Sequence, residues 1–428
     1  MNQENTSAPA ENKMGTMPIG KLLFNMSLPM MISMLVQALY NIVDSIFVAK
    51  LSENALTAVS LAFPLQTLLI AVGTGTGVGM NALLSKSLGE KNFKKANATA
   101  SNAAVLYFFS YLVFFILGFT IVRPFYASQI GNADQEIMEL GIEYLSTVMI
   151  FSFGLLAQVF FERLLTSTGR TIFSMTSQLT GAITNIILDP IFIFGLNQGA
   201  AGAAMATVLG NIIADIYYVY AVIKKSKRLT CSPSHMKITG RRVKDILMIG
   251  IPASITNIMQ TFMMVMTNNF LLPYGTDKVA AMGIALKVNM ITALVLVGFA
   301  FGGQPLVGYN YGAKNEKRLK NILKFAYLFE IGLGLLFTII MCIFAPQIIK
   351  VFMDKPDIIT NGAMMLRFQQ MGMIFMSVTL ISTCVCQAVG NAGGAFVLSI
   401  SRQGVIYVLA LLIMSNVFGY TGVLVSQA

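Results

Sequence analysis

Long apolar runs alternate with short polar segments along the whole chain. Eleven of these runs exceed the roughly 18 residues that a helix needs to cross a lipid bilayer. They lie at residues 22–49, 56–85, 101–123, 137–161, 172–196, 199–223, 246–273, 279–309, 322–349, 360–389 and 395–419. A twelfth run begins near residue 422, close to Ala428. Such lengths predict helices, because membrane β-strands have about 10 residues of alternating polarity. We predict an all-α polytopic membrane protein of twelve helices, with the twelfth truncated.

The composition agrees with a membrane protein and limits the chemistry of its sites. Only 11% of the 428 residues are charged and 56% are hydrophobic, whereas soluble domains carry about 25% charged residues. The polar residues 1–20 lack the basic segment and short apolar core of a signal peptide. His235 lies in a polar loop, and no zinc spacing or disulfide framework links the cysteines Cys231, Cys342, Cys384 and Cys386. We therefore expect a protein that is not an enzyme and needs no cofactor.

Lysine and arginine concentrate in every second loop. The basic loops are 85–95, 224–244 and 312–320, and the intervening loops 51–54, 195–199 and 274–278 are nearly neutral. Because Lys and Arg accumulate in cytoplasmic loops, this pattern predicts a cytoplasmic N-terminus in the cell membrane. The net charge of +11 then orients the protein in the bilayer, and we expect no nucleic-acid partner.

The two halves of the chain resemble each other at a fixed offset of 223 residues. Segment 75–95 aligns without a gap on segment 298–318, and the same offset pairs Pro29 with Pro252 and Phe47 with Phe270. Each half holds six runs, so both enter the membrane in the same direction, as in transporters with parallel repeats. We expect a cytoplasmic tail (1–20), two six-helix lobes (21–223 and 244–428) and a basic cytoplasmic linker (224–243).

A polar cluster interrupts the apolar segment 185–195, NIILDPIFIFG. Asn185 and Asp189 lie four residues apart and share a helix face, and Pro190 leaves the carbonyl of Ile186 without its helical donor. A carboxylate at bilayer depth costs at least about 2.5–3.5 kcal/mol, so it normally faces a protein-lined cavity. This oxygen-rich cluster predicts a site for a proton or small cation; a packed Asp with a structural role is the alternative.

Asp44 adds a second acid at a similar depth. Asp44, Asp189 and Thr207 lie about five, seven and eight residues from the outer ends of their runs, so at about 1.5 Å per residue their depths agree within a few Å. We predict that Asp44, Asn185, Asp189 and Thr207 form one cation or proton site, with the two carboxylates as possible Na⁺ ligands.

The second half lacks both acids. The repeat places Thr267 at the position of Asp44 and, at an offset of 224, Ile413 at the position of Asp189. This restriction to one half indicates energy coupling rather than a general need of the fold. For the charges in the second half, the simplest interpretation is a buried Lys287–Glu330 pair.

At these residues the chain resembles the multidrug and toxic compound extrusion (MATE) family, in its bacterial branch of DinF and MepA types. The matching segments are 28–49, 75–91, 185–208 and 302–315. The resemblance implies two six-helix lobes around a central cavity, and export of drugs against an inward H⁺ or Na⁺ gradient. It assigns Asp44, Asn185, Asp189 and Thr207 to the cation site of the N-terminal lobe. Pro29 matches a proline associated with bending of the first helix.

We expect an antiporter that acts as a monomer on small organic, cationic or amphipathic substrates, with a role in antibiotic resistance. The candidate residues of the substrate cavity are Gln37, Tyr40, Asn41, Gln260, Asn268 and Asn269. A flippase for lipid-linked oligosaccharides is the first alternative, but it would favour a strongly cationic cavity. An intramembrane lipid-modifying enzyme is the second, and the runs show no catalytic set for it.

Overall fold

The computed structural model describes residues 12–130, 135–225 and 239–427, and all of its regular elements in these ranges are helices. Within these described ranges, nine helices are long and apolar enough to span a membrane, or eleven if each of two bent helix pairs forms one span. These spans coincide with the eleven predicted runs, so the prediction of an all-α polytopic membrane protein is confirmed. His235 and Cys231 lie outside the described residues, as do the tail before residue 12 and most of the linker.

The first half runs from α1 to α10. Its elements are α1 (Lys13–Thr16), α2 (Ile19–Leu51), α3 (Glu53–Leu61), α4 (Phe63–Gly89), α5 (Phe93–Thr120), α6 (Val122–Ile130), α7 (Gln135–Ile150), α8 (Phe153–Ser167), α9 (Thr171–Pro190), the π-helical turn η1 (Ile191–Gly195) and α10 (Gly199–Lys225). The predicted run 56–85 is divided at Ala62, so the second span begins at Phe63 and a short α3 precedes it.

The second half runs from α11 to α17. Its elements are α11 (Gly240–Leu271), the 3₁₀ turn η3 (Leu272–Tyr274), α12 (Thr276–Gly312), α13 (Glu316–Phe352), α14 (Pro356–Met371), α15 (Met373–Val389), α16 (Ala392–Ile400), the π-helical turn η4 (Ser401–Val405) and α17 (Ile406–Val425). Helical geometry breaks at Gly419, where φ is 55°. The residues after this kink begin the segment in which the sequence predicted a twelfth helix.

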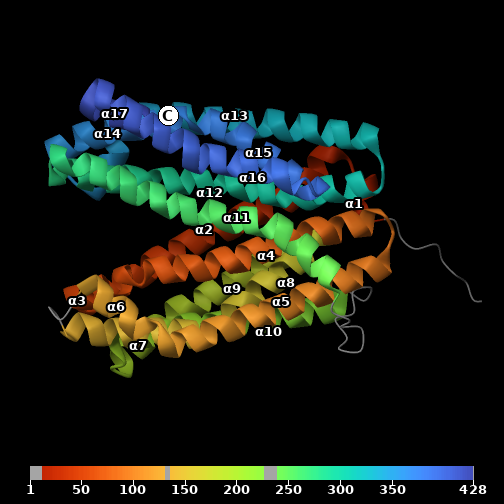
Figure 1. Cartoon of the computed structure of the whole chain (residues 1–428), viewed down its shortest axis with the longest axis horizontal. Helices are drawn as coiled ribbons and strands as arrows, with labels where there is room; N and C mark the ends of the chain where they lie inside the picture. The colour runs from red at the N-terminus through yellow and green to blue at the C-terminus, as the bar shows by residue number, and fades with distance from the viewer. Residues whose placement is uncertain (1–11, 131–134, 226–238, 428) are drawn as a thin grey trace, which may run out of the picture.

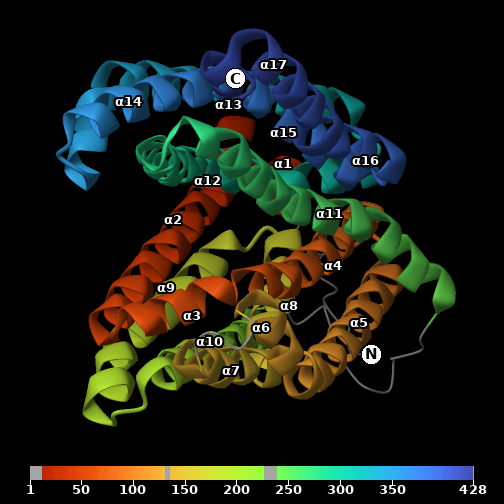
Figure 2. The same ribbon diagram turned by 60° about the vertical axis from the view of Figure 1, so that its left-hand side comes forward.

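The helices form two groups, which we call the N-lobe (α2–α10) and the C-lobe (α11–α17). Figure 1 shows the lobes close together at the end that carries α1 and farther apart at the end with α3, α6, α14 and α17. We call the first the basic end, because the basic segments 85–95 and 312–320 lie there, and the second the far end. Figure 2 shows α2, α4, α11 and α12 in the centre of the molecule, between the outer helices of the two lobes.

Glycines let the lobes touch backbone to backbone near the basic end. A Cβ atom on Gly75 would lie 2.6 Å from the carbonyl oxygen of Gly250, and one on Gly302 would lie 2.4 Å from the Cα of Ser27. Gly75 joins α4 to α11, and Gly302 joins α12 to α2. Because only a residue without a side chain allows this approach, these glycines hold the two lobes together.

The contacts at the basic end follow the internal repeat. Gly89 approaches the carbonyl oxygen of Tyr309, and Gly312 approaches that of Lys86; the offset of 223 exchanges these two pairs. The repeat partners Asn81 and Gln304 also bind each other, since Asn81 Nδ2 donates to Gln304 Oε1 at 3.0 Å. Gln304 in turn donates to Gln387 Oε1 at 2.8 Å. This buried relay of three amides joins α4, α12 and α15 across the interface.

The short helix α1 lies at the same end. Met14 is fully buried, and its carbonyl oxygen accepts hydrogen bonds from Asn310 at 3.2 Å and from Arg318 at 3.3 Å in the C-lobe. Its side chain packs against Gly169 in the N-lobe, where an added Cβ atom would lie 3.3 Å from Met14 Cγ. The segment before α2 therefore contacts both lobes.

Candidate cation site

Three of the predicted site residues form a hydrogen-bonded group between α9 and α10. The Nδ2 atom of Asn185 donates to Asp189 Oδ1 at 3.3 Å and to Thr207 Oγ1 at 3.2 Å. The spacing of four residues places Asn185 and Asp189 on one face of α9, and α10 packs against that face. Asp189 is fully buried and Asn185 is 2% exposed.

Asp44 on α2 lies near this group. Its carboxylate and that of Asp189 interact electrostatically, and both interact with the hydroxyl of Tyr40, one turn before Asp44 on the same helix. Two acids from different helices therefore face one region inside the N-lobe. This arrangement agrees with the equal depths that the sequence predicted for Asp44 and Asp189.

The site has more acceptor oxygens than donors. Asp44 Oδ1, Asp189 Oδ2 and Asn185 Oδ1 are buried, and none of them has a hydrogen-bond partner among the described residues. Buried acceptors are normally paired, because an unpaired one costs roughly 1–3 kcal/mol. A proton or a small cation bound to these oxygens would satisfy them, and oxygen ligands suit hard cations. The residues present therefore fit a proton or Na⁺.

A small cavity adjoins the group. It admits about one water molecule and is lined by Tyr40, Gln158, Gln178, Gly181, Ala182, Asn185, Thr207, Gly210 and Asn211. Gln158, Gln178 and Asn211 were not predicted. Sequence spacing could have indicated two of them. Gln178 precedes Asn185 by seven residues and Asn211 follows Thr207 by four, and both spacings place the side chains on one helix face. A cavity of this size suits an ion or water and excludes an organic substrate.

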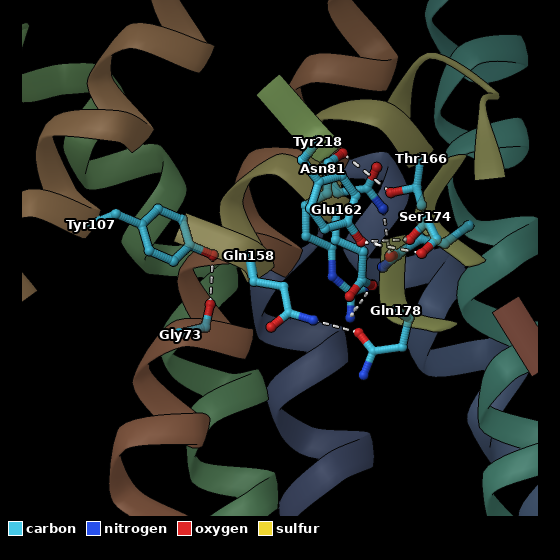
Figure 3. Close-up of polar contacts among 11 residues, drawn as sticks. Gly73, Asn81, Tyr107, Gln158, Glu162, Thr166, Ser174, Gln178 and Tyr218 are labelled. Atoms are coloured by element: carbon cyan, nitrogen blue, oxygen red, sulfur yellow. Dashed lines mark hydrogen bonds and ion pairs between the residues drawn. The ribbon is translucent and has the colours of Figure 1, made fainter. Parts of the chain in front are cut away.

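Polar contacts continue from the cavity through the N-lobe interior (Figure 3). Gln158 donates to Gln178 at 2.5 Å, and one turn further along α8, Glu162 forms an ion pair with Arg163 at 3.7 Å. The Arg163 guanidinium lies over the ring of Phe301, 4.8 Å from its centroid. Because Phe301 belongs to α12, this cation–π contact links the polar interior of the N-lobe to the C-lobe.

The repeat partner of Asp44 in the C-lobe contacts neutral groups. Thr267, the repeat partner of Asp44, forms a hydrogen bond with the hydroxyl of Tyr407, and Gln427 donates to both. Thr267 and Tyr407 are buried. Hydroxyl and amide groups thus satisfy one another here, and the excess of acceptors found in the N-lobe is absent from this cluster.

The predicted cavity residues take different environments. Gln37, Tyr40 and Asn268 are half-buried, whereas Asn41, Gln260 and Asn269 are exposed. Only Tyr40 lines the cavity beside the cation site. Pro29 is buried inside α2, which forms one helix from Ile19 to Leu51.

The expected Lys287–Glu330 pair is wrong. Glu330 is fully buried, Lys287 is exposed, and the ion pairs of the described residues do not join them. The physical reason is the direction of Lys287 on α12. It lies on a different face from Ala285 and Val288, which pack in the C-lobe core.

Comparison with known proteins identifies the family. The family model MatE matches the chain twice, over residues 29–191 and 252–412, and the starts of the two matches differ by the offset of the internal repeat. The chain belongs to the MATE family. Members of this family are transporters, so the protein is a multi-span membrane transporter and not an enzyme.

Relatives of this MATE protein include multidrug exporters. "Multidrug export protein MepA" of Staphylococcus haemolyticus is 30% identical over 418 residues, which cover 95% of this chain and 89% of the relative. The protein of the same name from Staphylococcus aureus is 28% identical over 417 residues, covering 95% and 90%. The predicted MepA-like branch is therefore confirmed.

Solved MATE structures share the fold over nearly the whole chain. A MATE transporter in complex with MaL6 has a TM-score of 0.92 at 24% identity, covering 98% of this chain and 94% of the other. A structure described as the outward-facing conformation of a multidrug resistance MATE transporter has a TM-score of 0.91 at 25% identity, with the same coverage.

Proposed function

We propose that this protein exports organic compounds from the cytoplasm in exchange for an inward flow of H⁺ or Na⁺. The observation that carries the proposal is the group of buried acceptor oxygens on Asp44, Asn185 and Asp189, which have no hydrogen-bond partners in the described part of the chain. The multidrug export activity named for the MepA relatives supports the choice of substrates. Small cationic or amphipathic compounds are the expected cargo.

Alternating access follows from the arrangement of the lobes. Residues 21–223 and 244–428 move as two bodies joined by the linker 224–243, and the contacts between glycine-containing helices at the basic end hold one orientation closed. If a cation binds more tightly in one orientation than in the other, it shifts the population of the two states. The same coupling free energy then lowers the affinity for the exported compound in that state.

Each member of the site has a role in this cycle. Asp44 and Asp189 carry the proton or share the sodium ion, and Asn185 and Thr207 supply neutral oxygen ligands and fix the orientation of Asp189 through their hydrogen bonds. Substrate contacts the larger space between the lobes, where we place Gln37, Asn41, Gln260, Asn268 and Asn269. Pro29 permits α2 to bend as the site changes occupancy, because a proline weakens the helix that contains it.

The basic end faces the cytoplasm in this proposal, because it carries the Lys- and Arg-rich loops. The N-terminus is then cytoplasmic, the protein resides in the cell membrane as a monomer, and the structure corresponds to the state that is closed toward the cytoplasm. The similarity to an outward-facing MATE structure supports this assignment.

Efflux of a cationic dye from vesicles, under separately imposed pH and Na⁺ gradients, tests the proposal. Wild type is expected to export dye with at least one of the gradients, and Asp44→Asn and Asp189→Asn are expected to lose gradient-driven efflux while inserting normally into the membrane. Full gradient-driven efflux by both variants would eliminate the coupling site.

A further inference from the structure

Lys287 is an exposed cation within a membrane-spanning helix. It lies in the apolar helix α12, and the hydrogen bonds, ion pairs and ring contacts given for the described residues do not include its side chain. A lysine at bilayer depth is costly, and such residues normally face the protein interior or a water-filled cavity. The direction in which Lys287 points decides which surroundings compensate its charge.

The neighbours of α12 define that direction. Ala285 packs in the C-lobe core, and Thr292 accepts a hydrogen bond from Gln370 of α14. On a helix with 3.6 residues per turn, Lys287 lies about 140–160° from both of them. It is therefore on the side of α12 opposite the C-lobe interior.

Two contacts show that this opposite side faces the N-lobe. Gly298 abuts the backbone of Met31 on α2, and the ring of Phe301 lies against Arg163 on α8. Helical geometry places Lys287 between these two directions, about 20° from Gly298 and about 40° from Phe301. Lys287 thus points toward the N-lobe rather than toward lipid.

Farther toward the far end, where the lobes lie farther apart (Figure 1), the facing surfaces of α12 and α2 carry exposed residues. Gly298 opposes Met31 and Gly302 opposes Ser27, so α12 and α2 run antiparallel. Eleven residues from Gly298, about 16 Å toward the far end, Lys287 is exposed, and Ile42, eleven residues beyond Met31, is 51% exposed. We call the space between these surfaces the interlobe opening. Asp44 follows Ile42 by two residues, so Lys287 lies across the opening at about the height of the cation site.

We propose that Lys287 binds the anionic group of the exported compound, a carboxylate, sulfonate or phosphate. This inference rests on the proposed export function and concerns which residue recognises a substrate that carries a negative charge. The ammonium group of Lys287 can donate three charge-assisted hydrogen bonds, and it has no acceptor among the residues that the structure describes. The N-lobe acids are then free to bind the coupling ion, while the opposite wall of the opening binds substrate.

Transport of a matched pair of compounds in everted vesicles tests this proposal. Norfloxacin is a zwitterion with a carboxylate, and its methyl ester lacks that negative charge. Lys287→Gln is expected to raise the KM for norfloxacin roughly tenfold or more, the effect of losing a charge-assisted hydrogen bond, and to leave the KM for the ester within about twofold. Lys287→Arg is expected to retain norfloxacin transport.

Lys278→Gln is the matched control. Lys278 is on the same helix, but its ammonium lies over the rings of Tyr420 and Tyr274 at the far end, 4.1 and 5.6 Å from their centroids. The same change in charge there is expected to affect both compounds equally. A uniform loss with Lys287→Gln, or equal KM values for norfloxacin in Lys287→Gln and wild type, would overturn the inference.

Chemical restoration of the charge provides a second measurement. In a variant with serine at the native cysteines, Lys287→Cys is treated with aminoethyl methanethiosulfonate, which attaches an ammonium group, or with the anionic sulfonatoethyl reagent. Only the ammonium is expected to restore norfloxacin transport. Restoration by both reagents would contradict a charge-specific role. If wild type exports the cationic dye but neither of these compounds, the inference about Lys287 is overturned and the export function stands; loss of dye efflux as well would refute the export function.

Discussion

The two lobes descend from one repeated pattern, but they differ at the position of Asp44. In the N-lobe, Asp44 and Asp189 each leave a carboxylate oxygen without a hydrogen-bond partner among the residues that the structure describes. In the C-lobe, Thr267 at the repeat position of Asp44 is bonded to Tyr407 and Gln427. The comparison teaches that the repeat preserves the scaffold, whereas the polar side chains at equivalent positions differ. We propose on this basis that cation binding is confined to the N-lobe.

The buried acid of the C-lobe does not restore the symmetry. Glu330 is fully buried, but the offset of 223 aligns it with Tyr107, whose hydroxyl donates to the carbonyl oxygen of Gly73 at 2.7 Å. Glu330 therefore occupies the place of a structural tyrosine rather than that of Asp44 or Asp189, although both of its carboxylate oxygens also lack hydrogen-bond partners among the described residues. The two lobes carry their acids at different positions of one template.

The largest expected effect is the difference in dye efflux between substitutions at Asp189 in the N-lobe and at Thr267 in the C-lobe. Asp189→Asn is expected to reduce gradient-driven dye efflux by about 5- to 150-fold, the range of a coupling free energy of about 1–3 kcal/mol. Thr267→Val in the C-lobe is expected to leave efflux within about twofold. Initial rates in vesicles with matched amounts of protein provide the measurement. Equal losses in the two variants would remove the functional difference between the lobes.

Substitution of repeat-related glycines at the basic end is expected to destabilise the protein equally in the two lobes, in contrast to substitution at the cation site. A Cβ on Gly79 would lie 2.2 Å from the carbonyl oxygen of Ile246, and one on Gly302 would lie 2.4 Å from the Cα of Ser27. Gly79→Val and Gly302→Val are each expected to cost about 1–3 kcal/mol by overpacking, seen as a lower melting temperature. Gly332→Ala is the control, because its Cβ would meet no atom within 4 Å.

Substitutions of two glutamines compare a contact between the lobes with a contact within one lobe. Gln304→Leu leaves Asn81 and Gln387 without their partner and is expected to cost about 1–2 kcal/mol, with increased access of a thiol reagent to the basic end. Gln370, which binds Asn289 and Thr292 inside the C-lobe, is the comparison. Gln370→Leu is expected to lower stability without changing access; equal access in both variants would contradict a role of the relay in closing the lobes.

The smallest expected effect concerns the neutral ligands. Thr207→Val removes the acceptor of the Asn185 hydrogen bond, worth about 0.6 kcal/mol on average within membranes, and is expected to weaken cation affinity about threefold. Tyr407→Phe removes a C-lobe hydrogen bond of similar kind and is expected to leave the cation dependence unchanged. Dye efflux titrated against pH and Na⁺ compares the two variants.

The spans and part of the site could be predicted from the sequence. The eleven runs were readable because a bilayer imposes a minimum helix length, and the Asn185–Asp189 group because a spacing of four residues fixes one helix face. The proximity of Asp44 to this group was predicted from its depth in the membrane alone. These features depend on distances along a helix, which the sequence encodes directly.

The other features depend on how helices are rotated against one another. Gln158 on α8 meets Gln178 on α9, and no spacing within either helix indicates this contact. The Lys287–Glu330 pair failed for the same reason: both residues lie in the C-lobe, but α12 turns Lys287 toward the N-lobe. Packing between helices decides such directions, and it becomes visible only in the structure.

The most direct test measures the linkage between cation and substrate in purified protein. The dissociation constant of a fluorescent substrate is titrated against pH and Na⁺ for wild type and for a variant with both Asp44→Asn and Asp189→Asn. The account predicts that substrate affinity depends on at least one cation in wild type and on neither in the double variant, by reciprocity of the coupling. An unchanged cation dependence in the double variant would contradict it.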